Sequence, residues 1–286
     1  TRPPESVPVA PPPDMGPHTD TPLPVPAPAA APAATLPRAP VLGIPLALTD
    51  YEGTMDWMDG LIAARGRACL SAAAVHLVMV AREDERTRDA VLAAMTVPDG
   101  QPLVWALRAL GHPQASRVYG PELMSRYCER AAQTGARMFL YGGRNQGALV
   151  QLVLNLRRRH PGIRIVGGYS PPYRPLTEEE RHAVAAEINR SRADVVWVGT
   201  GQPKQERWME EMRELLDAPI LAGVGAAFDF HAGLVPQAPS WMQAAGLEWA
   251  FRLAQEPRRL WKRYARYNPL FIAGFARQLL THRRRR

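Results

Sequence analysis

From Val41 onward, short apolar blocks alternate with longer stretches in which apolar residues recur at helical spacing. Four of the short blocks are rich in β-branched or aromatic residues and too short for helices, so they predict buried strands. They lie at 136–141, 163–166, 194–198 and 219–224. Helices are expected at 145–159, 177–191 and 203–216, the second with Thr177 as N-cap. Strand–loop–helix units in series predict an α/β fold, a Rossmann-like parallel sheet with helices on both faces.

In such a sheet, ligands bind outside the carboxyl ends of the strands. Three loops follow predicted strands there, with the sequences YGG, GTGQPKQE and VGAAFDFHAG. In the second, Gly199 and Gly201 precede a helix whose free N–H groups suit a pyrophosphate, although glycines at such a place also serve a plain turn. Tyr141 and Gly142 of the first loop are candidates of the same kind.

The two ends of the chain differ in composition from its middle. Residues 1–40 form a Pro/Ala tract with few large apolar side chains, which predicts a disordered or polyproline-like arm and no signal peptide, because an apolar h-region is missing. The formal net charge is +8, but residues 252–286 alone carry eleven Lys or Arg and one acid, Glu256. We therefore expect an arm at 1–40, a nearly neutral α/β domain at 41–245 and a basic appendage at 246–286.

The appendage contains a helix pattern between Pro257 and Pro269, the latter expected to end the helix. At about 100° per residue, one face is apolar and aromatic and the other basic. The apolar face consists of Leu260, Trp261, Tyr264 and Tyr267; the basic face consists of Arg258, Arg259, Lys262, Arg263 and Arg266. This pattern predicts a helix lying in a membrane interface, with a helix packed on the core as the alternative. The LFIAGFARQLL segment that follows is too short to span a bilayer.

Single residues give fewer indications. Asp99 lies in a VPDG sequence that suits a turn, but a carboxylate between two apolar blocks can also act as a general base. Arg117, taken alone, is expected to be a surface charge. Asp229 and His231 resemble metal ligands, but a third ligand at suitable spacing and a DxD motif are missing, so a core histidine and no metal are expected. Cys69 and Cys128 are expected to be buried thiols.

Seven blocks give the chain, from about Val41 to Leu280, a resemblance to the WecG/TagA/CpsF glycosyltransferase family, glycosyltransferase family twenty-six. They read AAVHLVM, VPDGQPLVWALRALG, RVYGPELM, FLYGG, GTGQPKQERW, VGAAFDFHAG and QAPSWMQAAGLEWAFRLAQEPRRLWKRY, in the family's order. The resemblance implies a Rossmann-like α/β core with a C-terminal helical appendage that docks on the membrane and helps to complete the active site. It also implies an inverting transferase that needs no metal and no cofactor besides its UDP-sugar donor.

By that resemblance Asp99 is the candidate general base. Arg117 and Gln205 fall on family positions tied to activity or donor binding. The arginines of the appendage, here Arg252, Arg258 and Arg259, are candidate contacts to the UDP pyrophosphate, and the substrate-binding set also includes Lys204 together with Tyr141, Gly142, Gly199 and Gly201. Many members carry T-x-N where this sequence has Ala72 and Ala74, so the contacts of that Thr and Asn do not carry over.

The function expected from this resemblance is transfer of a sugar from a UDP-sugar to a polyprenyl-pyrophosphate-linked acceptor in cell-surface polysaccharide synthesis. The protein is then expected to be peripheral at the cytoplasmic face of the cell membrane, held by an anionic membrane surface. A catalytically impaired nucleotide-sugar-binding scaffold is the alternative, favoured by Ala72 and Ala74. A nucleic-acid partner is not expected, because an aromatic stripe serves no purpose on phosphate. Homo-oligomerisation, the donor sugar and the linkage stay open.

Overall fold

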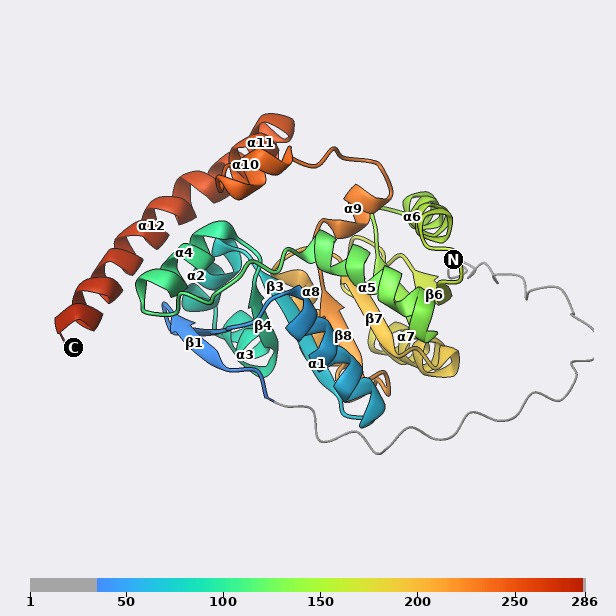
Figure 1. Ribbon diagram of the computed structural model, residues 1–286. Helices are drawn as coiled ribbons and strands as arrows, with labels where there is room; N and C mark the ends of the chain where they lie inside the picture. The colour runs from blue at the N-terminus through green and yellow to red at the C-terminus, as the bar shows by residue number, and fades with distance from the viewer. Residues whose placement is uncertain (1–34, 285–286) are drawn as a thin grey trace, which may run out of the picture.

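Figure 1 shows the computed structural model of the 286-residue chain, which describes residues 35–284. The predicted arm therefore lies outside the described residues as far as residue 34, and so do Arg285 and Arg286. The first strand, β1 (Arg38–Val41), begins inside the range predicted for the arm and pairs with β2 (Ile44–Ala47) in an antiparallel hairpin.

The centre of the molecule is a six-stranded parallel sheet with the order β4-β3-β8-β7-β5-β6. Its strands are β3 (Ala68–Ala73), β4 (Met95–Pro98), β5 (Arg137–Gly142), β6 (Arg164–Tyr169), β7 (Val195–Gly199) and β8 (Ile220–Gly223). The four predicted strands correspond to β5, β6, β7 and β8, so the predicted α/β fold is confirmed. Every side chain of β7 from Val195 to Val198 is fully buried, as the continuous β-branched run predicts for a central parallel strand.

Helices cover both faces of this sheet because its side chains alternate in direction. Val195 and Trp197 pack with α1 (Tyr51–Ala63), α5 (Gly120–Thr134), α6 (Gln146–Arg159) and α9 (Ala227–His231) on one face. Val196 and Val198 pack with α7 (Glu178–Ser191) and α8 (Lys204–Met212) on the other face. A third core joins the hairpin to α2 (Val75–Glu83), α3 (Glu85–Ala93) and α4 (Gln101–Ala109).

Helix ends follow local capping rules. Thr177 and Glu180 form the predicted capping box at the start of α7. The helix expected at 203–216 is shorter than predicted, since α8 spans Lys204–Met212. At the start of α2, by contrast, Ala74 holds the N-cap position with no side-chain hydrogen bond to offer.

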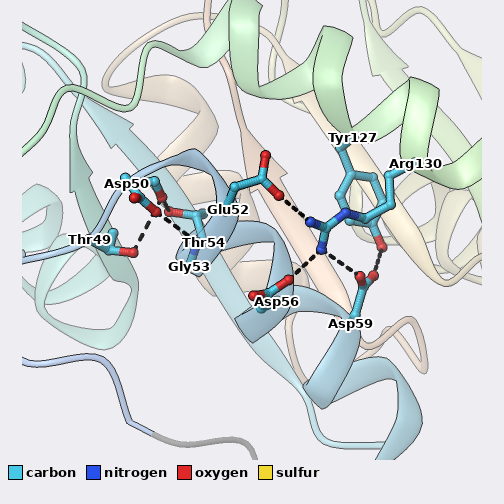
Figure 2. A network of polar contacts seen from close by, with 9 residues as sticks. All are labelled: Thr49, Asp50, Glu52, Gly53, Thr54, Asp56, Asp59, Tyr127 and Arg130. Carbon is cyan, nitrogen blue, oxygen red and sulfur yellow. Dashed lines mark hydrogen bonds and ion pairs between the residues drawn. The ribbon is translucent and has the colours of Figure 1, made fainter.

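An ion-pair network ties α1 to α5 (Figure 2). The guanidinium of Arg130 on α5 contacts three carboxylates on one side of α1: Glu52 at 2.5 Å, Asp56 at 2.6 Å and Asp59 at 3.0 Å. The hydroxyl of Tyr127 also donates to Asp59, over 2.8 Å. Because these carboxylates are spaced by one helical turn, a single cation holds the helix along much of its length.

The C-terminal part contains α10 (Ser240–Ala244), α11 (Glu248–Gln255) and α12 (Pro257–Arg284), with α12 running along α2 and the hairpin (Figure 1). The prediction that Pro269 ends the helix is wrong, because α12 continues through it. Proline removes one backbone hydrogen bond, but packing of the next turns compensates for it. Phe271 is buried in the third core, and the Gln278 side chain bonds to the backbone of Leu42 and Pro40.

The predicted faces of α12 also need correction. Leu260 is buried and Tyr267 packs against the third core, as the alternative of a helix packed on the core predicts, whereas Trp261 points outward with 53% of its surface exposed. Arg263, assigned to the basic face, lies on the inward side, one turn from Leu260. The boundary between the faces thus lies about one residue from its predicted position. Within residues 35–284, α12 and the other helices all fall short of the length and apolarity that a bilayer-spanning helix requires.

Candidate active site

A cavity of about 1180 Å³ opens at the carboxyl ends of the parallel strands, where the sheet meets the appendage. The four inner strands and the edge strand β4 contribute residues to it: Ala72 and Ala74 at the end of β3, Asp99 after β4, Tyr141 on β5, Gly199 on β7 and Gly225 after β8. The appendage supplies Arg252, Glu256, Arg259, Leu260 and Arg263. The site thus lies where the fold class predicts, but one of its walls comes from the far end of the chain.

Asp99 lies directly after β4, in a turn that two segments hold in place. Its backbone N–H donates to the carbonyl of Ala73 over 2.9 Å, and its Oδ1 accepts from the N–H of Gly120 over 2.6 Å. Burial raises the pKa of this carboxyl from 3.8 to about 6, against the lowering effect of Arg117. A carboxylate with that pKa is deprotonated at neutral pH and still a stronger base than an exposed aspartate.

Arg117 holds the turn that carries Asp99, so the expectation of a surface charge is wrong. Its Nε donates to the backbone oxygen of Asp99 over 2.5 Å, and its Nη2 pairs with Glu248 of α11 over 2.5 Å. The guanidinium also lies 4.3 Å from the ring centre of Tyr119. Arg117 does not line the cavity. The structure therefore places it behind Asp99, between the core and the appendage.

Gln205 is also placed behind the cavity wall. Its side chain is fully buried, its amide oxygen accepts from the N–H of Gly225 over 2.9 Å and its amide nitrogen donates to Glu206 over 2.9 Å. The hydroxyl of Ser71 donates to the same Glu206 oxygen over 2.8 Å. Burial raises the pKa of the Glu206 carboxyl. In this arrangement Gln205 fixes the loop after β8 and does not itself face the cavity.

The predicted glycines serve different purposes. A Cβ on Gly199 would lie 2.4 Å from the ring of Phe228, and one on Gly142, whose φ is +138°, would lie 2.7 Å from the backbone of Gly199. Both positions therefore need glycine for close packing. Gly201 has open space around it and a φ of +82°, so only its backbone conformation favours glycine. Gly199, Gly201 and the exposed Lys204 line the cavity, whereas Gly142 does not.

Aromatic rings form one wall of the cavity. Tyr141 stacks on Trp208 with ring centres 3.8 Å apart and on Tyr169 at 5.8 Å. Burial raises the pKa of the Tyr141 hydroxyl, so the ring stays neutral. Both Tyr141 and Trp208 line the cavity. A planar group entering here meets a flat apolar surface, to which stacking gives affinity.

The wall of the cavity that the appendage forms is positively charged. Arg252, Arg259 and Arg263 line the cavity, whereas Arg258 is exposed and does not. Burial, together with the neighbouring cations Arg252 and Arg259, lowers the pKa of Arg263 to about 10, and its Nε has no hydrogen-bond partner among the described residues. Arg263 was predicted on the basic face of the helix; its spacing of three residues from Leu260 was the signal that it faces inward.

The other candidates have structural partners. Asp229 forms two hydrogen bonds with the guanidinium of Arg144, at 3.0 and 3.1 Å. His231 is buried with its Nε2 2.8 Å from the carbonyl of Pro121, and the expectation of a core histidine is confirmed. Cys69 and Cys128 are buried and free, as expected. Within residues 35–284, no three His, Cys, Asp or Glu side chains are grouped as metal ligands would be.

The parallel sheet, together with a cationic and aromatic cavity at the ends of its strands, defines an α/β protein with a site for an anionic, planar ligand. Residues 39–285 match the family described as the glycosyl transferase WecG/TagA/CpsF family. Because the match covers most of the chain, the protein belongs to this glycosyltransferase family.

Two relatives carry the name N-acetylglucosaminyldiphosphoundecaprenol N-acetyl-beta-D-mannosaminyltransferase. The protein of Bacillus spizizenii is 32% identical over 198 residues, which cover 68% of this chain and 72% of the relative. The protein of Bacillus subtilis is 34% identical over 167 residues, which cover 58% of this chain and 62% of the relative.

Proposed function

We propose that the protein transfers a sugar from a UDP-sugar to a polyprenyl-pyrophosphate-linked sugar, with inversion at the anomeric carbon. The observation that carries this proposal is that Asp99, a carboxyl with a pKa of about 6, shares one cavity with the guanidinium of Arg263, whose Nε has no hydrogen-bond partner among residues 35–284. A base and a group that stabilises an anionic leaving group are the two requirements of a direct displacement.

In the proposed reaction, Asp99 removes the proton from an acceptor hydroxyl while that oxygen attacks the anomeric carbon of the donor. The bond from this carbon to the β-phosphate oxygen breaks on the opposite face, and UDP leaves with the electron pair. One bond forms and one breaks in a single step, so the configuration is inverted. The proton stays on Asp99 until solvent takes it after product release.

Negative charge develops on the β-phosphate as UDP leaves. Arg252, Arg259 and Arg263 supply positive charge in the same cavity, and guanidinium groups bind phosphate oxygens in bidentate fashion. Gly199 and Gly201, just before α8, also line the cavity, and backbone N–H groups at the start of a helix suit an anion. These groups provide the charge stabilisation that a metal ion supplies in other transferases, and we therefore propose a metal-independent reaction. The Tyr141–Trp208 stack is the surface offered to the uracil ring.

The acceptor follows from the two relatives, whose names describe transfer to an undecaprenyl-diphosphate-linked N-acetylglucosamine. A long-chain lipid acceptor stays in the bilayer, so the enzyme must work at a membrane surface. We propose that this surface is the cytoplasmic face, where UDP-sugars are made, and that the protein binds it peripherally. The outward side of α12 offers Trp261, Leu270, Ile272 and Leu280, next to basic side chains.

The test is transfer from a panel of UDP-sugars to a synthetic polyprenyl-pyrophosphate N-acetylglucosamine, with wild type and Asp99→Asn. We expect one donor to be used and the variant to lose about 10²–10⁴-fold in kcat, the range of general-base catalysis. Normal turnover by the variant would refute the assignment of the base. Tight UDP-sugar binding without turnover by the wild type would instead favour the scaffold alternative, with Ala72 and Ala74 on the β3 wall as its structural basis.

A further inference from the structure

Glu248 connects the appendage to the turn that carries Asp99. It lies in the first turn of α11, and its Oε2 is 2.5 Å from Nη2 of Arg117. Both side chains are largely buried, with 16% of Arg117 and 15% of Glu248 exposed. An ion pair at that depth is screened little by solvent, so it has a defined geometry and an electrostatic effect on its neighbours.

Arg117 has two anionic groups within reach and is held by one of them. Its Nε is occupied by the backbone oxygen of Asp99, and its Nη2 by Glu248. Among the described residues, the carboxylate of Asp99 takes part in no ion pair and accepts its hydrogen bond from the N–H of Gly120. Glu248 thus keeps the guanidinium beside Asp99 while directing its charge away from the carboxylate.

The charged groups that face Asp99 come from several elements. Arg117 and Tyr119 precede α5, Tyr51 lies on α1, Glu248 and Arg252 lie on α11, and Arg263 lies on α12. Burial raises the pKa of Asp99, Arg117 lowers it, and Glu248 raises it again, while Gly120 and Arg252 lower it. Without Glu248, a freed Arg117 and Arg252 would both stabilise the ionised form of Asp99.

We infer that Glu248 is a positioning residue. By binding Arg117 when α11 is docked, it prevents that guanidinium from pairing with the Asp99 carboxylate, and Asp99 stays available to accept a proton. The inference rests on the proposed function. It links the two parts of the site directly, because the appendage that brings the arginines of the cavity also brings the carboxylate that controls Arg117. A detached appendage leaves Arg117 free to pair with Asp99, and the base is weakened.

The first experiment needs no turnover. The titration of the Asp99 carboxyl is followed by NMR with ¹³C-labelled aspartate, with Asp99→Asn to assign the signal. We expect Glu248→Gln, which keeps an acceptor for Arg117 but removes the charge, to lower the Asp99 pKa by about 0.5–1 unit. The matched control is Glu83→Gln, since Glu83 also ties the appendage to the core, through Arg266 and Tyr267. An unchanged titration in Glu248→Gln, or an equal shift in both variants, overturns the inference.

The second experiment uses the pH dependence of kcat with the donor and acceptor found for the wild type. Glu248→Gln should shift the acidic limb to lower pH and reduce the plateau about 3–10-fold, because a weaker base transfers the proton less well. Glu248→Asp should restore part of the plateau, and Glu83→Gln should keep the wild-type profile. If the wild type shows no transfer while the NMR shift is found, the proposed function fails and the positioning role stands; a reduced plateau with an unshifted limb overturns the positioning role.

Discussion

At the scale of single residues, Asp99 combines catalytic potential with a cost in stability. Its pKa is raised from 3.8 to about 6, so the folded state resists ionisation more than the unfolded chain does. The associated stability is fully present below pH 3.8 and is lost as pH rises through about 6. Because asparagine does not ionise, Asp99→Asn avoids this loss of stability at high pH. We expect the variant to be more stable than wild type by about 1–3 kcal/mol at pH 8 and nearly equal to it at pH 4.

The measurement is urea unfolding of both proteins at the two pH values. A difference of the same size at pH 4 and pH 8 would show that the substitution acts through packing and not through ionisation. Combined with the activity assay, the result tests whether this residue exchanges stability for function, as residues at active sites commonly do.

Two glycines of one loop allow a second prediction. Gly199→Ala places a Cβ 2.4 Å from the buried ring of Phe228, and we expect a loss of about 2–4 kcal/mol because the ring cannot move without disturbing the core. Gly201→Ala meets open space and only a strained φ of +82°, with an expected loss of about 1 kcal/mol. Thermal unfolding of both variants under one condition tests the order. Equal losses would mean that Phe228 can rearrange.

Residues near the strand ends could be identified from sequence because their position follows from local order along the chain. Tyr141 and Gly199 lie at or directly after the ends of predicted strands, and both line the cavity. Asp99 lines it too, but β4 was not among the predicted strands and local rules left a plain turn open, so its role was favoured only by the family resemblance. The roles of Arg117 and Arg263 could not be predicted from the sequence, because each depends on a contact between distant segments. Arg117 pairs with a residue 131 positions later, which local spacing does not encode.

At the scale of elements, α12 shows tertiary packing overriding a local rule. Proline stops most helices, and Pro269 was therefore expected to be a boundary. The residues after it carry their own inward face, with Phe271, Phe275 and Leu279 packed against the hairpin core. The four strands β5 to β8 were predicted accurately, since each is a compact run that turn residues bound, whereas β1 to β4 were not predicted as strands. Helix length and direction depend on what lies beneath the helix, which the sequence pattern gives only in part.

A prediction about Pro269 tests this view. Pro269→Ala restores a donor within α12 and removes the clash of the ring, so we expect the helix to gain about 1–3 kcal/mol in local stability. Hydrogen exchange of the amides in the turns around residue 269 should slow about tenfold or more. As a control, the amides of α7, which lies on the other side of the molecule from α12 (Figure 1), should exchange at unchanged rates. Unchanged exchange near residue 269 would mean that packing already supplies all the stability of that turn.

At the scale of the whole molecule, the sheet positions Asp99 and the appendage supplies the cations. The sequence indicated both parts, but their approach appears only in the fold, where residues of α11 and α12 line the same cavity as residues at the carboxyl ends of β3 and β4. Closing the cavity in this way brings Arg252, Arg259 and Arg263 to the same space as Asp99. Because the site combines residues of the sheet with residues of the C-terminal appendage, its geometry depends on where the appendage is docked.

The outward side of α12 gives the final prediction, that the appendage binds anionic membranes through apolar side chains as well as charge. Trp261 and Ile272 are 53% and 68% exposed, and burying both in an interface contributes a few kcal/mol at most, about 1–3. Changing both to Ser should therefore weaken binding to vesicles with anionic lipid about tenfold or more. The matched control changes Val150 and Leu154, which are exposed on α6 at the far end of the molecule from α12 (Figure 1).

Vesicle co-sedimentation at two salt concentrations separates the contributions. The weaker binding of the Trp261 and Ile272 variant relative to wild type should persist at high salt, because it comes from lost apolar contact. Binding of the wild type should itself weaken at high salt, as the ions screen the arginines. If the α6 control lost as much binding as the α12 variant, exposed apolar surface in general would be responsible and the orientation proposed for the protein would be wrong. If neither variant lost binding while salt abolished it, the attachment would be electrostatic alone, and α12 would lie on the headgroups without inserting.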